Sequence, residues 1–235
     1  MQTHRISRRS APDTVALRRM TPTEGEPLGG LTTNRIAALT DGVFAVAMTL
    51  LVLDFHVPAL PGDATAAQLD GALTRLWPQV LSYVAGFVVL GTLWIGHHYQ
   101  FHFIRRADRP LLWINLGFLL AVAFLPFCIA LLGTFGTLAT PCVLYGTTLL
   151  IAGSCLTGHW SYATRRRRLV DASLDQTVVR ALRARIHGGM VVYGVGLALA
   201  FISPRASLVT YAAMPLLYLI PGQIDRHSMP DRHRS

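Results

Sequence analysis

Six long apolar segments dominate the sequence, and each has about the length that a helix needs to cross a membrane. A transmembrane helix takes roughly 20 residues to span about 30 Å of hydrocarbon. The segments run over residues 36–56, 77–98, 111–132, 138–162, 184–202 and 206–224. Only 14% of the residues are charged, against about 25% in an average soluble domain. We therefore predict an all-α integral membrane protein with six transmembrane helices per subunit.

The apolar segments divide the chain into three parts. Residues 1–34 are polar and rich in Arg, Thr and Pro, a composition that cannot bury enough apolar surface to fold and that predicts a disordered basic tail. Residues 35–224 form the predicted six-helix transmembrane domain. Residues 225–235 form a short C-terminal tail.

The arginines predict how these helices cross the membrane. All 21 basic residues are Arg, and a cytoplasmic N-terminus places 19 of them inside, leaving Arg75 and Arg205 outside. This split follows the positive-inside rule, so we expect a multi-pass protein of the bacterial cytoplasmic membrane with both termini cytoplasmic. The run Arg165–Arg168 is interpreted first as a topology determinant and second as a contact for anionic membrane lipids. We expect no nucleic-acid partner.

The first apolar segment carries ionisable residues, which cost about 2.5–3.5 kcal/mol each at the centre of a membrane helix. Arg35 and Asp41 are six positions apart, about 240° around a helix, so they cannot pair within it. Partners at the same depth on other helices are His97, His98 and Asn115. A network of these residues either only locks helix packing or also takes part in conduction or proton sensing.

Asp54, with His56 beside it, lies at the opposite, predicted external end of the first segment. A ring of such carboxylates at a pore mouth would concentrate cations. The alternative is an ordinary solvated helix terminus.

Four residues between the carboxylates share one stripe of the same helix: Val46, Thr49, Leu50 and Leu53. In a single chain such a stripe packs against neighbouring helices. In a symmetric oligomer it would form stacked rings around an axis, and the apolar rings would act as a dewetting gate.

Histidines collect toward the predicted inner face, at His97, His98, His102, His159 and His187. His98 and His102 are four positions apart and so share a helix face, a spacing that suits a transition metal. An integral-membrane metalloenzyme is therefore one alternative function, and a proton-conducting path through Asp41 and His98 is another. The sequence has no phosphate-binding glycine loop, no nucleophile elbow and no Thr-Val-Gly-Tyr-Gly potassium filter.

The first helix resembles the signature helix of the endolysosomal potassium channel family, transmembrane protein 175, in its bacterial members. That family's motif is Arg, three variable residues, Phe-Ser-Asp and then Gly-Val-Phe-Ala. This chain reads Arg35-Ile-Ala-Ala-Leu-Thr-Asp41-Gly-Val-Phe-Ala45. The likeness extends to residue 133 through Trp94-Ile-Gly-His97-His98, Asp108-Arg-Pro-Leu-Leu-Trp-Ile-Asn115, Phe124-Leu-Pro126-Phe and Ala130-Leu-Leu-Gly133.

The resemblance implies a passive potassium channel, not an enzyme, which forms a homotetramer, needs no cofactor and lines its pore with the first helix of each subunit. By position, it places Val46 at the main apolar constriction, Thr49 at a hydroxyl ring, and Leu50 and Leu53 at further apolar layers. It also places a polar network near the cytoplasmic end, made of Arg35, Thr40, Asp41, His98 and Asn115.

The chain departs from the family pattern at three positions. Leu39 and Thr40 replace the motif's Phe and Ser, although Thr40 keeps the hydroxyl. Val46 stands where a larger Ile or Leu is usual. We therefore expect a wider constriction that wets more easily, and only weak to moderate selectivity for potassium.

Overall fold

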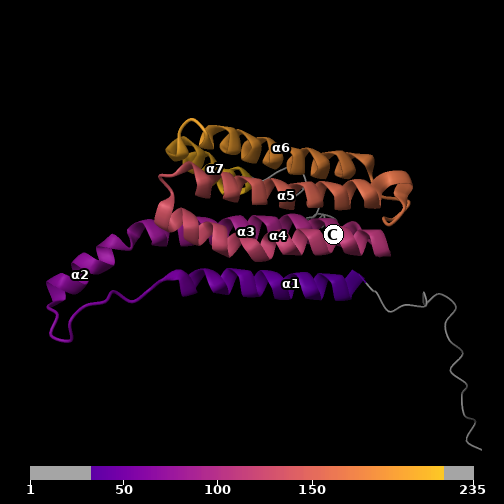
Figure 1. The fold of residues 1–235 in the computed structure, drawn as a ribbon. Helices are drawn as coiled ribbons and strands as arrows, with labels where there is room; N and C mark the ends of the chain where they lie inside the picture. The colour runs from indigo at the N-terminus through magenta and orange to yellow at the C-terminus, as the bar shows by residue number, and fades with distance from the viewer. Residues whose placement is uncertain (1–32, 220–235) are drawn as a thin grey trace, which may run out of the picture. The chain divides into compact units, whose positions relative to one another are not determined.

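The computed structural model describes residues 33–219, and it is helical throughout its regular structure (Figure 1). The predicted C-terminal tail and all but two residues of the predicted N-terminal tail lie outside the described residues. The helices are α1 (Thr33–Leu50), α2 (Ala66–Arg75), α3 (Trp77–Phe103), α4 (Arg109–Phe135), α5 (Ala139–Thr164), α6 (Gln176–Ala200) and α7 (Pro204–Leu219), with short 3₁₀ turns η1 (Leu51–Asp54) and η2 (Arg165–Arg167).

Four stretches of helix are long and apolar enough to cross a membrane: Thr33–Asp54, Trp77–Phe103, Arg109–Phe135 and Ala139–Arg167. These confirm the first four predicted spans and a multi-pass, all-helical membrane protein. The fifth and sixth predicted spans correspond to α6 and α7, which do not meet that standard within the described residues. Three arginines in the first half of α6 reduce its hydropathy, and α7 has 16 described residues.

The prediction of six transmembrane helices did not include α2, which makes a seventh α-helix in the described part of the chain. Thr65 starts α2 with a capping box: its backbone N–H donates to Oε1 of Gln68 at 2.8 Å, and the Gln68 N–H donates to Thr65 Oγ1 at 3.4 Å. None of its ten residues is buried. A search for long apolar segments could not find a helix that is short and lacks a buried face.

The first helix, α1, packs along α3 and α4 (Figure 1). Its buried residues recur every three or four positions and so form one face: Ile36, Thr40, Phe44, Ala47 and Leu51. The Phe44 ring lies 5.8 Å from the ring of Phe118 in α4, which stacks in turn on His97 of α3 at 5.4 Å. One face of α1 is therefore set into the helix bundle and the opposite face is left outside it.

The side chain of Tyr211 in α7 packs against the backbone at two glycines, where any larger residue would overlap it. Its hydroxyl donates to the carbonyl of Cys142 at 3.1 Å. A Cβ added at Gly146 of α5 or at Gly196 of α6 would overlap the Tyr211 side chain. The two glycines therefore allow α5, α6 and α7 to approach one another closely.

Replacing Gly196 with Ala should destabilise the protein by about 1–3 kcal/mol, because the new methyl group overpacks the Tyr211 contact. Gly194→Ala is a matched control in the same helix, since no heavy atom lies within 4 Å of its added Cβ. The control should keep or slightly raise stability, because Ala exceeds Gly in helix propensity by about 1 kcal/mol. Thermal unfolding in detergent measures both. Equal losses in the two variants would contradict a specific contact between Gly196 and Tyr211.

Candidate functional site

The four stripe residues, three in α1 and Leu53 in η1, lie on the face of the first helix that is turned away from the rest of the helical bundle. The exposed fractions are 57% for Val46, 43% for Leu50 and 68% for Leu53, and Thr49 is also exposed. Gly42 and Ala45, on the same side, are exposed as well. A membrane-spanning helix thus presents a stripe of small apolar residues, a hydroxyl and larger apolar residues, in that order along the chain.

The Thr49 hydroxyl is oriented by its own helix. Its Oγ1 lies 3.0 Å from the carbonyl oxygen of Ala45 and 2.9 Å from that of Val46. The hydroxyl has one proton to donate, and the backbone accepts it. The oxygen lone pairs of Thr49 are therefore left to accept from water or to coordinate a cation.

A shallow apolar groove runs beside this stripe between α1 and α4. It is lined by Ala38, Leu39, Gly42, Val43, Val46, Ala47, Leu50 and Ala123. Leu39, which replaces the family's Phe, is 55% exposed and lines this groove. The departure at position 39 therefore affects the outer surface of α1, whereas Thr40 beside it is fully buried.

Thr40 belongs to a buried polar chain that joins α1, α4 and α3. The Asn115 amide Nδ2 donates to Thr40 Oγ1 at 3.4 Å, and Asn115 Oδ1 accepts from His97 Nε2 at 3.0 Å. All three side chains are buried. Asn115 thus bridges the first helix to a histidine, and that histidine is His97, not the His98 that the resemblance assigned to the network.

Asp41 is held by a second contact between α1 and α3. The indole Nε1–H of Trp94 donates to Asp41 Oδ1 at 2.7 Å, and His98 stacks on the Trp94 ring with centroids 5.3 Å apart. Arg35 lies on the exposed side of α1. Sequence reasoning did not name Trp94 as a partner of Asp41, although an indole N–H in a membrane span needs an acceptor and Asp41 was the acidic group at that depth.

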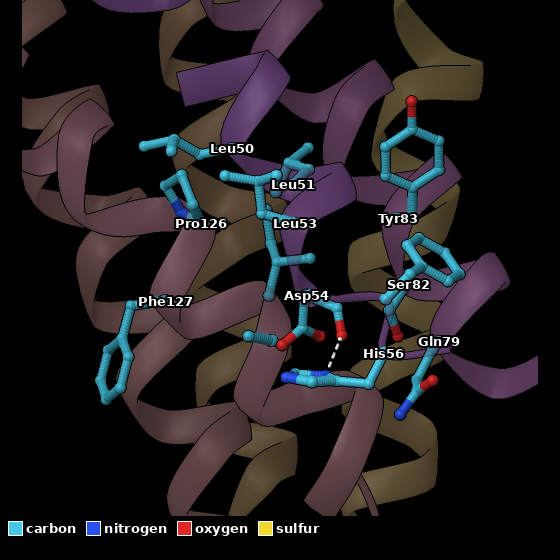
Figure 2. Close-up of a pocket in the computed structure, with 13 residues that line it drawn as sticks. Leu50, Leu51, Leu53, Asp54, His56, Gln79, Ser82, Tyr83, Pro126 and Phe127 are labelled. Carbon is cyan, nitrogen blue, oxygen red and sulfur yellow. Dashed lines mark hydrogen bonds between the residues drawn. The ribbon is translucent and has the colours of Figure 1, made fainter. Parts of the chain in front are cut away.

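Asp54 and His56 line a cavity of about 250 Å³ at the other end of the first helix (Figure 2). The cavity is lined by the end of α1, by η1 and the two residues after it, by the start of α3 and by the second half of α4, with Gln79, Ser82 and Phe127 on its wall. The His56 Nδ1–H donates to the Asp54 carbonyl at 2.9 Å, which fixes the imidazole beside the Asp54 carboxylate (Figure 2). Asp54 is partly buried here.

The histidines predicted at the inner face do not come together as ligands. His97 and His159 have ring centroids 5.7 Å apart, His98 and His102 are exposed, and His187 Nδ1 donates to the Arg183 carbonyl at 2.8 Å. Among residues 33–219, no three His, Cys, Asp or Glu side chains form a group that could hold a metal ion.

The part of the chain that holds these residues also matches known proteins. Residues 35–126 match the family model of the endosomal/lysosomal potassium channel TMEM175. A potassium channel of Streptomyces collinus is 33% identical over 188 residues, which are 78% of this chain and 90% of that protein. The endosomal/lysosomal proton channel TMEM175 of Bos taurus is 36% identical over 101 residues, which are 21% of that protein.

The fold has a solved counterpart in the crystal structure of a lysosomal potassium-selective channel TMEM175 homolog from Chamaesiphon minutus. The two structures agree with a TM-score of 0.69 at 29% sequence identity, over 79% of this chain and 95% of that one. The match therefore extends beyond the signature helix to most of the helical bundle. Taken with the likeness to the Streptomyces protein along nearly its whole length, it shows that this chain belongs to the TMEM175 family.

Proposed function

We propose that this protein is a passive potassium channel whose pore is lined by the exposed stripe of α1. The observation that carries the proposal is the placement of Val46, Thr49, Leu50 and Leu53 on the outward face of a membrane-spanning helix. The Streptomyces relative is named a potassium channel and the Chamaesiphon relative a potassium-selective channel, which supports potassium as the permeant ion.

One exposed helix face cannot enclose an axis, so the pore needs the same face from other copies. We infer a homotetramer, as the family resemblance implies, with four α1 helices around a central axis. Gly42 and Ala45 on the exposed face support this arrangement, because small side chains let helices approach closely in a membrane. A closed ring of identical subunits is also the usual form of a symmetric oligomer.

In such a tetramer the stripe supplies a constriction made of two kinds of ring, one apolar and one of hydroxyl groups. Rings of Val46, Leu50 and Leu53 exclude water and raise the barrier to any ion that keeps its hydration shell. The Thr49 ring offers oxygen lone pairs that replace part of that shell, because the hydroxyl proton is bonded to the helix backbone. Potassium loses its water more easily than sodium, so it is favoured, and the smaller Val46 ring makes that preference weak to moderate.

The polar contacts of α1 then act as anchors that keep the stripe on the axis. Thr40 and Asp41 are bonded to α4 and α3, and Phe44 fills the bundle core one turn further on. At the predicted external mouth, Asp54 carboxylates from four subunits would concentrate cations. Both termini are assigned to the cytoplasm by the distribution of arginines.

A proton path is the second candidate, because Asp41, Trp94 and His98 form one contact group and the mammalian relative is named a proton channel. The metalloenzyme alternative has no comparable support within residues 33–219.

The direct test is ion flux through the purified protein in liposomes. With an imposed potassium gradient and no valinomycin, we expect cation flux carried by the protein. Current across a pH gradient in potassium-free solution separates the proton candidate. Absence of potassium flux from correctly folded, reconstituted protein would refute the channel proposal, and a proton current without potassium current would favour the alternative.

Val46→Asn should raise both potassium and sodium flux and reduce the selectivity between them, because an amide ring wets the apolar constriction. Val191→Asn is the matched control: Val191 is 65% exposed but belongs to α6, away from the stripe. Bi-ionic reversal potentials measure the change. Unaltered potentials and conductance in Val46→Asn would show that Val46 does not line the narrow point.

Trp94→Phe should destabilise the protein and lower potassium flux, because it removes the donor to Asp41 and frees the N-terminal half of α1. A hydrogen bond to a charged group contributes about 1.5–3 kcal/mol. Trp113→Phe makes the same change at a Trp that is 72% exposed on α4, and it should leave both readouts near wild type. Thermal unfolding and liposome flux would be compared in parallel. If the two variants behave alike, the Trp94 contact does not anchor the pore helix.

A further inference from the structure

A basic pocket lies at the end of α5, away from the stripe of α1. Its lining residues are Tyr162, Arg165, Arg166 and Arg168. The arginines are exposed where the chain leaves the helix, on the side that the positive-inside rule assigns to the cytoplasm. The channel function proposed above uses none of these residues.

The backbone of this turn is unusual. Arg166 and Arg167 both have φ of 53°, in the left-handed region that glycine or asparagine enters far more readily. The turn is held by its surroundings: Ile104 and Val170 form an antiparallel bridge, and the Arg105 N–H donates to the Leu169 carbonyl at 2.8 Å. Backbone strain that a fold maintains in this way is concentrated at functional sites.

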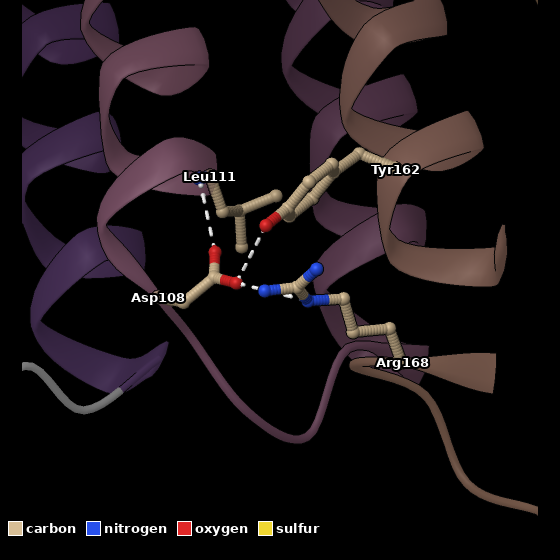
Figure 3. A network of polar contacts seen from close by, with 4 residues as sticks. All are labelled: Asp108, Leu111, Tyr162 and Arg168. Atoms are coloured by element: carbon tan, nitrogen blue, oxygen red, sulfur yellow. Dashed lines mark hydrogen bonds and ion pairs between the residues drawn. The ribbon is translucent and has the colours of Figure 1, made fainter. Parts of the chain in front are cut away.

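Arg168 is fixed in place by a contact with the start of α4 (Figure 3). Its Nε lies 3.3 Å from Asp108 Oδ2, and the Tyr162 hydroxyl donates to the same oxygen at 2.7 Å. The other oxygen of Asp108 accepts from the backbone N–H of Leu111 at 3.1 Å. The Arg168 guanidinium also lies 5.2 Å from the centre of the Tyr162 ring. One carboxylate therefore orients the wall of a pocket that carries three guanidinium groups.

Arg167 faces a different carboxylate. Hydrogen bonds from Ser173 lower the pKa of Asp171, and the charges of Arg105 and Arg167 lower it further. Arg167 does not line the pocket. The two left-handed arginines thus differ: Arg166 contributes to the pocket, and Arg167 lies near Asp171.

We propose that this pocket binds a phosphate group, presented by an anionic lipid headgroup or by free phosphate. Guanidinium groups are suited to this ligand because their planar N–H donors match phosphate oxygens. Membrane topology alone requires positive charge in the loop, but it does not require arginines in a left-handed turn around a pocket. A phosphate group accounts for the three guanidinium groups at the pocket and for the left-handed conformation that places Arg166 there.

The test measures binding of short-chain phosphatidic acid and of inorganic phosphate to the purified, full-length protein by native mass spectrometry and thermal shift. Arg166→Gly removes a guanidinium from the pocket and also suits the left-handed backbone. It should keep or raise thermal stability and weaken phosphatidic acid binding about tenfold, the value of one charge-assisted hydrogen bond. Arg167→Gly is the matched control, with the same relief of strain and no loss of affinity.

The comparison has distinct outcomes. Loss of phosphatidic acid binding in Arg166→Gly but not in Arg167→Gly supports the site. The ligand is then a lipid headgroup if inorganic phosphate does not compete with phosphatidic acid for the wild-type protein, and free phosphate if it competes equally. Equal losses in Arg166→Gly and Arg167→Gly would indicate attraction to bulk charge and overturn the site. Unchanged binding in Arg166→Gly, or no binding to the wild-type protein, would also overturn it. Since the readout is binding, the result does not depend on ion flux.

Discussion

The hydrogen bond from the Trp94 indole to the Asp41 carboxylate, at 2.7 Å, shows the constraint on which the rest of this structure depends. A polar group within a membrane has no bulk water to bond, so it must find a partner in the protein. Asp41 meets that need through α3, and Thr40 meets it through Asn115 of α4. These adjacent residues therefore tie the first helix to two different neighbours.

Once those contacts are made, the orientation of α1 follows. Thr40, Phe44, Ala47 and Leu51 turn into the bundle. The helix geometry then directs Val46, Thr49 and Leu53 outward. The exposed stripe of the first helix, which the proposed channel uses as its pore lining, is thus the consequence of a polar and aromatic attachment on the opposite face. This links the network and the stripe, which the sequence presents as two separate patterns.

Much of the architecture could be predicted from local pattern. The first four spans match helices of the structure because apolar length alone identifies a membrane helix. The helix α2 was missed because it is short, has no buried residue and depends on the Thr65–Gln68 cap. The sequence pattern also could not show whether His97 or His98 bonds Asn115. Adjacent residues on a helix differ by about 100° in direction, and only the position of α4 makes His97 the partner of Asn115.

The sequence by itself determined the class of this protein, the position of its main spans and its family, because these depend on composition, segment length and an ordered motif. Only the tertiary structure decided which face of α1 is buried, that Trp94 bonds Asp41, and that Tyr162, Arg166 and Arg168 surround one pocket. Those relations join residues far apart in the chain. They depend on how helices pack, and helix packing cannot be read from the periodicity of any single helix.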